Sequence, residues 1–338
     1  SSEGNAWLSL NGRDMLPKSK LFSALTISGS YRLQAGDAWE NVPDSFATLD
    51  KLWLRSSTGF NSLYSYRSSM TLRDTYSAAM RWSPFKEYGF SGMAAPIKTI
   101  SIINNFSQSY QTSEDLGSQY ETVTSTLPDV VFYIDELEKL FGAYDNILSG
   151  TNLKLKYALS TNETLGTSYK EDIAYGGDLR FVLFNYFDTT LSYTQQTQDQ
   201  TDLLVNQPLA SYLRKDFSAQ TSFSHRAFRF TPKITYIYDR SEEVGDVLVD
   251  SVEEIVPSLN IRVDFNLPFS FRLPILGAQY LMTNRVIWNT TASYSRRRSF
   301  TVEENRDLLD ITTSLDYEIS KNMRITLSGA FQNFKHLY

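Results

Sequence analysis

The stretch PSLNIRVDFNLP, residues 257–268, alternates between apolar and polar residues with a period of two. Leu259, Ile261, Val263, Phe265 and Leu267 are apolar, and the residues between them are polar or charged. A β-strand directs successive side chains to opposite faces, so this stretch predicts a strand with one apolar and one polar face. The kind of protein depends on whether the apolar face meets other protein groups or lipid.

The same alternation recurs along the chain. The clearest further stretches are residues 23–33, 151–160, 227–239, 308–320 and 322–331. Less regular strands are predicted near residues 62–72, 75–84, 97–112, 116–126, 178–187, 189–198, 211–224 and 284–297. Together these predict roughly 14 to 16 strands of about 9 to 13 residues, a length that crosses a bilayer at a tilt.

Composition narrows the class of protein. The chain has 338 residues, no Cys and a net charge of −6, and its basic residues form no single patch, so we expect no nucleic-acid partner. No run of 18 apolar residues is present, which excludes a membrane helix. Residue 1 is Ser and no signal peptide is visible, so we interpret the chain as mature or excised. The mean hydropathy of −0.31 also suits a barrel, because a barrel has a polar lumen.

An apolar face without charges fits a soluble β-sandwich as well as a membrane barrel. Three features favour the barrel: the strand length, the connections and the placement of aromatic residues. Short turns (NYFDTT, SHRA, ISKN) alternate with long polar segments (residues 196–211, 240–254 and 296–307) that we expect to be loops. Aromatic residues lie toward the ends of the apolar faces, namely Tyr31, Phe228, Tyr238, Phe265, Tyr317 and Phe331.

We therefore predict an all-β fold, an antiparallel transmembrane β-barrel or a large segment of a wider barrel, as one domain over residues 1–338. The alternation assigns each side chain to one face. The predicted lipid-facing residues are Leu153, Leu155, Leu259, Ile261, Val263, Phe265, Leu315 and Leu327. The predicted lumen-facing residues are Lys154, Lys156, Arg229, Lys233, Arg262, Asp264, Asp310, Asp316 and Arg324.

Two stretches depart from the alternation. In TLPDVVFYIDELEKLFGAYDN, residues 126–146, Pro128 opens a short predicted strand, and a short helical insertion follows near residues 135–142. Its apolar residues share one helical face, and Gly142 suits a C-terminal cap. In FSFRLPILG, residues 269–277, Pro274 is expected to interrupt a hydrogen-bonded ladder, as is the preceding Pro268.

Catalytic and metal-binding patterns are weak. His225 has Ser222 and Ser224 beside it, but we expect a turn histidine and no enzyme activity. The acidic residues of 239–254 match no defined cation site, so we expect no metal and no cofactor. Residues 296–298, Arg-Arg-Arg, are expected at the outer rim, near lipopolysaccharide phosphates.

LPDVVFYIDELEKLFG, residues 127–142, followed by NLKLKYALSTNETLGTS, residues 152–168, resembles the recurring signature of SprA-type proteins. These are the outer-membrane translocons of type IX secretion. RWSPFKEYGF, residues 81–90, and residues 310–334 are also similar to that family's barrel. The resemblance implies a very wide barrel in the bacterial outer membrane that passes folded proteins and is gated by partner proteins.

Members of that family are several times longer than this chain. Either the chain is a piece whose edge strands pair with further barrel segments, or it is a smaller relative that closes on itself. The partners implied are membrane lipid, lipopolysaccharide and other secretion-system proteins. Two alternatives stay open at this point: a closed general porin or solute channel, and a soluble β-rich surface protein.

Overall fold

The computed structural model describes residues 2–39 except 17, 67–115, 118–141, 147–243, 247–267, 272–275, 278–281, 285–299, 305–320 and 323–336. Fourteen strands form one antiparallel sheet, and each strand pairs with its neighbours in sequence. They are β1 (Ser2–Asn11), β2 (Leu25–Trp39), β3 (Arg67–Trp82), β4 (Ser101–Asp115), β5 (Ser118–Asp135), β6 (Leu148–Thr164), β7 (Ser168–Leu183), β8 (Phe187–Asp202), β9 (Gln207–His225), β10 (Phe228–Glu243), β11 (Val247–Asn266), β14 (Arg285–Ser299), β15 (Arg306–Ser320) and β16 (Met323–His336).

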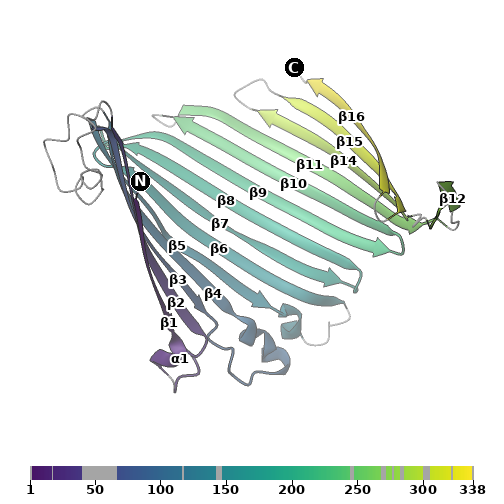
Figure 1. The fold of residues 1–338 in the computed structure, drawn as a ribbon, viewed down its shortest axis with the longest axis horizontal. Coiled ribbons are helices and arrows are strands. Elements are labelled where there is room, and N and C mark those ends of the chain that lie inside the picture. The colour runs from purple at the N-terminus through teal and green to yellow at the C-terminus, as the bar shows by residue number, and fades with distance from the viewer. Residues whose placement is uncertain are drawn as a thin grey trace.

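The sheet curls but does not close within the described residues. Its order runs from β1 to β16, and these two edge strands pair only with β2 and β15. Figure 1 shows them far apart, at opposite ends of the sheet. The predicted fold class is confirmed in this form: the chain builds a large segment of an antiparallel barrel-type wall.

The strands are longer than predicted, and several predicted loops are strand. β9 has 19 residues and β11 has 20. The described residues of the segments 196–211 and 240–254 therefore belong mostly to ladders. Within the first segment, the turn Leu203–Asn206 joins β8 to β9. The third predicted loop, 296–307, is strand at both ends, and its residues 300–304 lie outside the described ones. The expected contrast between short turns and long loops is thus wrong for these hairpins.

Other predicted strands merge or shift. The predictions at 62–72 and 75–84 fall on one strand, β3, although residues 62–66 lie outside the described ones. The first described strand is β1, which precedes the first predicted strand at residues 23–33, so the edge of the sheet lies near Leu8. Pro274 lies within the short strand β12 (Arg272–Ile275), which pairs with β13 (Ala278–Leu281) in a separate sheet, whereas Pro268 lies outside the described residues.

Pro128 does not open a separate strand. β5 runs through it, and a register shift between Thr126 and Asp129 absorbs the extra residues. The helical insertion is a 3-10 helix, η4 (Leu137–Phe141), and Gly142 lies outside the described residues. Two more short helices are α1 (Gly12–Met15) and η3 (Gly92–Thr99). Within the described residues, no helix is long and apolar enough to cross a membrane.

A buried carboxylate fastens η4 to the rim of the sheet. Glu138 is 8% exposed, and Thr151 donates to it through its backbone amide at 3.1 Å and through its hydroxyl. The Glu138 amide donates in turn to the Thr151 hydroxyl at 2.9 Å. Burial opposes the ionised carboxylate, but the bonds donated by Thr151 outweigh it and place the pKa of Glu138 below its usual value.

The lowered pKa predicts a pH-dependent clamp. A depressed carboxylate pKa stabilises the folded form at neutral pH, and that contribution is lost as the pH falls through the folded pKa. Glu138→Gln should lower the free energy of local opening near η4 by roughly 1–3 kcal/mol at neutral pH and remove its acid sensitivity. Hydrogen exchange of residues 136–141, corrected for intrinsic rates, measures this. Glu136→Gln, an exposed partner of Lys139, is the control, and an equal effect of both changes would contradict the clamp.

Candidate functional site: the two faces of the sheet

The strand register keeps one set of side chains on a single face across the sheet. Directly opposed residues of an antiparallel pair share a face. One such row reads Leu155, Gly177, Tyr193, Phe217, Tyr236 and Ile255 from β6 to β11. A parallel row on the other face reads Lys154, Asp178, Ser192, Ser218, Thr235 and Val256. We name these the apolar face and the polar face.

The residues predicted to face lipid and those predicted to face the lumen lie on opposite faces of the sheet. All eight predicted lipid-facing residues lie on the apolar face, for example Leu153 opposite Leu179 and Leu315 opposite Leu327. All nine predicted lumen-facing residues lie on the polar face, among them Arg229 opposite Arg262. Whether these faces meet lipid and a lumen stays a prediction, because the register alone does not identify the solvent.

Two residues have surroundings that the alternation did not indicate. Val263 is only 5% exposed, because the aromatic side chains of Phe228 and Trp288 lie directly opposite it on both neighbouring strands. It also lies near the end of β11 rather than at its middle. Asp316 is 6% exposed on the polar face, where Arg324 and Thr326 donate hydrogen bonds to it.

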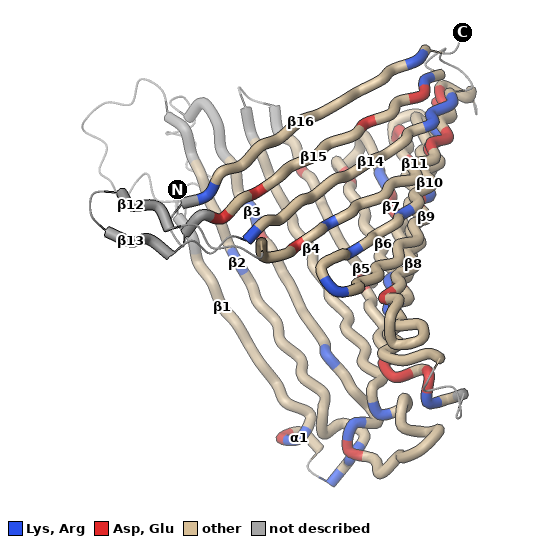
Figure 2. Tube along the Cα trace, turned by 90° about the vertical axis from the view of Figure 1, so that its right-hand side faces the viewer, with Lys and Arg blue, Asp and Glu red and all other residues tan. Residues whose placement is uncertain are grey.

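The apolar face carries an uncharged belt beginning at the rim of the sheet that contains η4. On β10 the belt runs from Phe228 to Tyr238, and on β11 from Phe265 to Ile255. The neighbouring strands give comparable runs, for example Val286–Tyr294 and Leu309–Tyr317. Among the described residues, charged ones enter this face only beyond the belt, toward the opposite rim. Figure 2 shows that charged residues, counted without regard to face, gather near the C-terminal end of that rim. We name this uncharged zone the apolar belt.

Aromatic rows border the apolar belt on both sides. At the rim of η4, Phe187 stacks on Phe223 with ring centroids 5.3 Å apart, and Phe223 stacks on Phe230 at 6.5 Å. At the other border, Tyr31 contacts Tyr76 at 5.0 Å, and Tyr76 contacts Tyr110 at 6.3 Å. The tyrosine rings combine an apolar body with a polar hydroxyl, which favours the boundary between an apolar and an aqueous phase, whereas the phenylalanine rings contribute apolar surface alone.

Nothing among the described residues covers the belt. Leu155 is 45% exposed, Ile234 is 44% exposed and Leu327 is 63% exposed. Buried hydrophobic side chains are few over the described part of the chain: Ala35, Pro96, Val252, Val263, Val286 and Ile287. The described main sheet is a single layer, so its apolar belt needs an apolar solvent or another protein surface.

The polar face carries opposite charges that are mostly paired. Arg285 donates to both carboxylate oxygens of Asp264, at 2.9 and 2.6 Å, and Arg180 does the same to Asp188, at 2.9 and 2.7 Å. Arg214 pairs with Asp216 at 2.8 Å. The polar face is therefore wettable and mixed in sign, without a ring of one charge.

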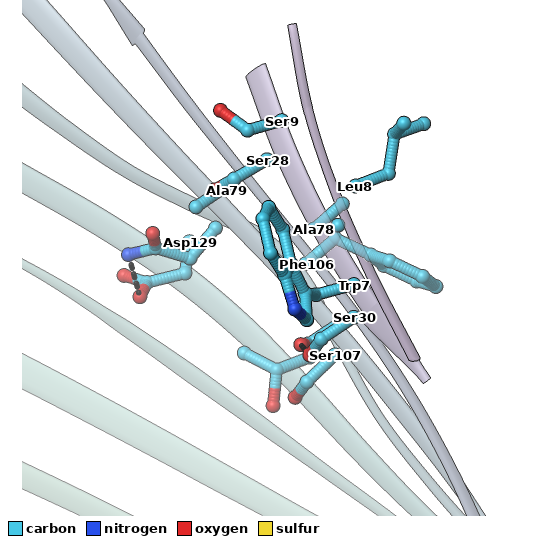
Figure 3. A pocket seen from close by; sticks show the side chains of 14 residues that line it. Trp7, Leu8, Ser9, Ser28, Ser30, Ala78, Ala79, Phe106, Ser107 and Asp129 are labelled. Carbon is cyan, nitrogen blue, oxygen red and sulfur yellow. Dashed lines mark hydrogen bonds between the residues drawn. The ribbon is translucent and has the colours of Figure 1, made fainter. Parts of the chain in front are cut away.

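A hollow on the polar face lies beside the open edge. Its volume is about 480 Å³, and small side chains from β1 to β4 form its floor. Ser30 and Ser77 share a hydrogen bond at 2.6 Å, and Asn105 donates to Asp129 at 3.1 Å (Figure 3). Trp7 borders the hollow and is 83% exposed, because its edge strand has no neighbour on one side.

Gly176 and Gly177 leave both faces of the sheet without side chains at one point of β7, where the neighbouring strands approach closely. A Cβ atom at Gly176 would lie 2.3 Å from the Tyr193 carbonyl oxygen, and one at Gly177 would lie 2.8 Å from Leu155. Hollows of about 420 Å³ on the apolar face and about 290 Å³ on the polar face meet these residues. The sequence shows this feature only as two adjacent glycines inside a strand pattern.

The predictions of no enzyme and no cofactor stay untested. His225 ends β9 on the apolar face and stacks on Phe223, whereas Ser222 and Ser224 lie on the polar face. The three residues therefore do not form a catalytic arrangement. Arg296 and Arg298 share the apolar face beyond the belt, and Arg298 pairs with Asp307 at 2.9 Å. Among the described residues, no group of His, Asp or Glu is arranged to hold a metal ion.

Comparison with known proteins gives no family. No protein-family model matches the chain, and no curated protein is similar to it. Among solved structures, one described as "Copper transporter OprC" shares 9% sequence identity with a TM-score of 0.42. The alignment covers 99% of this chain and 60% of that chain, so this chain spans less than two thirds of that protein's length.

The close approach at Gly176 yields a stability prediction. Gly176→Ala should push β7 away from β8 and lower the free energy of unfolding by about 1–3 kcal/mol, as overpacking does. Gly36→Ala is the matched control, because a Cβ atom there meets nothing within 4 Å. The urea unfolding midpoints of both variants, measured in the same solvent, test this. Equal midpoints would contradict the close approach of Gly176 to the Tyr193 carbonyl oxygen.

Proposed function

We propose that the chain is a membrane-embedded wall of a bacterial outer-membrane channel. The observation that carries this is the apolar belt, an uncharged zone on a single-layer sheet, bordered by aromatic rows. Its runs of about 9–11 residues match the length at which a tilted strand crosses the hydrocarbon. At about 3.4 Å per residue and a 45° tilt, the belt is about 25 Å tall, which is the height of the apolar band in outer-membrane barrels.

A soluble sandwich accounts for the belt less well. A sandwich covers its apolar face with a second sheet about 10 Å away, whereas the described main sheet forms one layer. In water, fourteen strands with an uncovered apolar belt would aggregate. Lipid is the solvent that suits this face, and the polar face then lines the interior of the channel.

The open edges favour a wide channel that the chain builds with other polypeptide. β1 and β16 each leave one side of their backbone without a partner among the described residues. In lipid, each unsatisfied backbone group would cost several kcal/mol, so both edges must pair. Pairing with further wall segments would give a barrel much wider than fourteen strands, wide enough for folded proteins.

The specific proposal is a protein-conducting translocon component of type IX secretion. It is supported by the resemblance of residues 127–142 and 152–168 to SprA-type proteins, and by the mixed, paired charges of the polar face. A closed porin is the second candidate, because fourteen is an even strand count within the range of closed barrels.

Substitutions near the middle of the belt test whether the apolar face meets lipid. Ile234→Arg should reduce insertion far more than Thr235→Arg, because Ile234 lies mid-belt on the apolar face and Thr235 lies on the polar face. An arginine at the bilayer midplane costs about 2–4 kcal/mol. The fraction of heat-modifiable, folded protein after insertion into vesicles measures the difference, and equal yields would contradict the assignment.

Cysteine labelling distinguishes a belt that is exposed to lipid from a belt that is packed against protein. The chain has no Cys, so single substitutions are clean. In membranes, Leu259→Cys should react with a lipid-soluble maleimide and Lys233→Cys with a membrane-impermeant one. If Leu259→Cys resists the lipid-soluble reagent, the belt is packed against protein and the membrane proposal fails.

Crosslinking across the seam distinguishes the wide barrel from the porin. Cys pairs between residues 2–11 and 323–336 can form disulfides only where Cα atoms come within about 7 Å. We expect no intramolecular crosslink in native membranes, because other strands should occupy both edges. Efficient crosslinking, together with steady small-solute conductance from the purified chain, would instead identify a self-closed porin.

A further inference from the structure

The strands continue past the apolar belt at the rim opposite η4. β9 leaves the belt at Phe217 but begins at Gln207, and β10 leaves it at Tyr238 but ends at Glu243. An extension of roughly eight residues rises about 19 Å at a 45° tilt. The hairpins β6–β7, β8–β9 and β10–β11 therefore project side by side beyond the belt (Figure 1).

Exposed apolar residues lie at or beside the ends of these hairpins, although the sequence around them is polar. Leu204 is 75% exposed, Val205 is 61% exposed and Val247 is 60% exposed. We name as the tip row the described apolar residues at the turns or first strand positions of the three hairpins: Leu165, Leu203, Leu204, Val205, Val247 and Val249. Apolar side chains with this much exposed surface, gathered at one rim in a polar stretch of sequence, mark a binding surface.

Hydrogen bonds hold the part of the tip row that lies on the β6–β7 and β8–β9 turns. Asp202 accepts from the amides of Leu204, at 2.8 Å, and Val205, at 3.4 Å. The Leu203 amide donates to the Thr167 carbonyl oxygen at 2.9 Å, which links two neighbouring tips. These bonds present the apolar side chains outward in a defined arrangement.

The surroundings of the tip row are acidic. The strand ends that carry it are residues 163–171, 199–210 and 240–250. Their described residues include two cations, Lys170 and Arg240, and seven carboxylates, namely Glu163, Glu171, Asp199, Asp202, Glu242, Glu243 and Asp250. Arg240 is paired with Glu242. Asp199 and Glu243 are both exposed, so their charge is available to a partner.

We propose that the tip row is a docking site for a protein whose surface presents an apolar hollow edged by Lys and Arg. The inference rests on the proposed function, because a membrane around the belt places the tips in water beyond it. Apolar tips supply the desolvated contact, and the acidic collar supplies charge complementarity and steering. The same collar would repel anionic lipid headgroups, which favours a protein over a membrane surface.

The experiment places a photo-crosslinking phenylalanine at position 204 of the full chain in its native membrane. The matched control position is 186, because Tyr186 is 66% exposed at a turn on the opposite rim. We expect a discrete protein adduct at 204, crosslinked through a segment that carries Lys or Arg beside apolar residues. Its yield should fall roughly tenfold or more in the Asp199→Lys, Glu243→Lys double variant, because like charges then meet across the interface.

Three outcomes would overturn the proposal: a lipid adduct at 204, no adduct at 204, or a protein adduct whose yield is unchanged by charge reversal. Heat-modifiable migration of each variant is measured in the same samples. If the parent chain lacks this signature, the membrane function itself fails. If the signature is intact and the adduct is absent, only the docking site fails.

Discussion

The period-two facing that the antiparallel ladders keep from strand to strand is the constraint on which the other features depend. A slip of one residue in any strand would transfer that strand's apolar side chains to the polar face. Each strand is held by pairing along nearly its full length, so the row from Leu155 to Ile255 stays on one face through six strands. The apolar belt and the paired charges of the polar face are both consequences of this register.

Where the sequence breaks the alternation, a bulge restores it. Thr126 and Asp129 both lie on the polar face although they are three residues apart, because the register shifts at Leu127 and Pro128. The register shifts again between Ser149 and Asn152, beside the clamp of Glu138 and Thr151. A bulge bends its strand and unpairs one residue, but it keeps the facing that the rest of the wall requires.

Sequence reasoning predicted the belt strands because their alternation of apolar and polar residues is strong, as in Leu259 to Phe265. It missed the strand extensions because QTQDQTD, residues 196–202, is polar on both faces and resembles a loop. It divided β5 because the bulge at Pro128 inverts the phase of the alternation. The clamp of Glu138 by Thr151 joins residues from different elements, so no local pattern could have indicated it.

The few buried hydrophobic side chains change how the stability of such a fold must be explained. A soluble domain of this size would draw its stability from an apolar core, whereas this sheet keeps Ile234 and Leu327 exposed on its belt. The stability of the wall must then come from its backbone ladder and from the solvent that meets the belt. On the proposed function, the strand extensions beyond the belt lie in water, so they have little apolar surface to bury and depend on the ladder alone. Exposed leucines and valines at their tips add nothing to that ladder, which is why a partner explains them better than folding does.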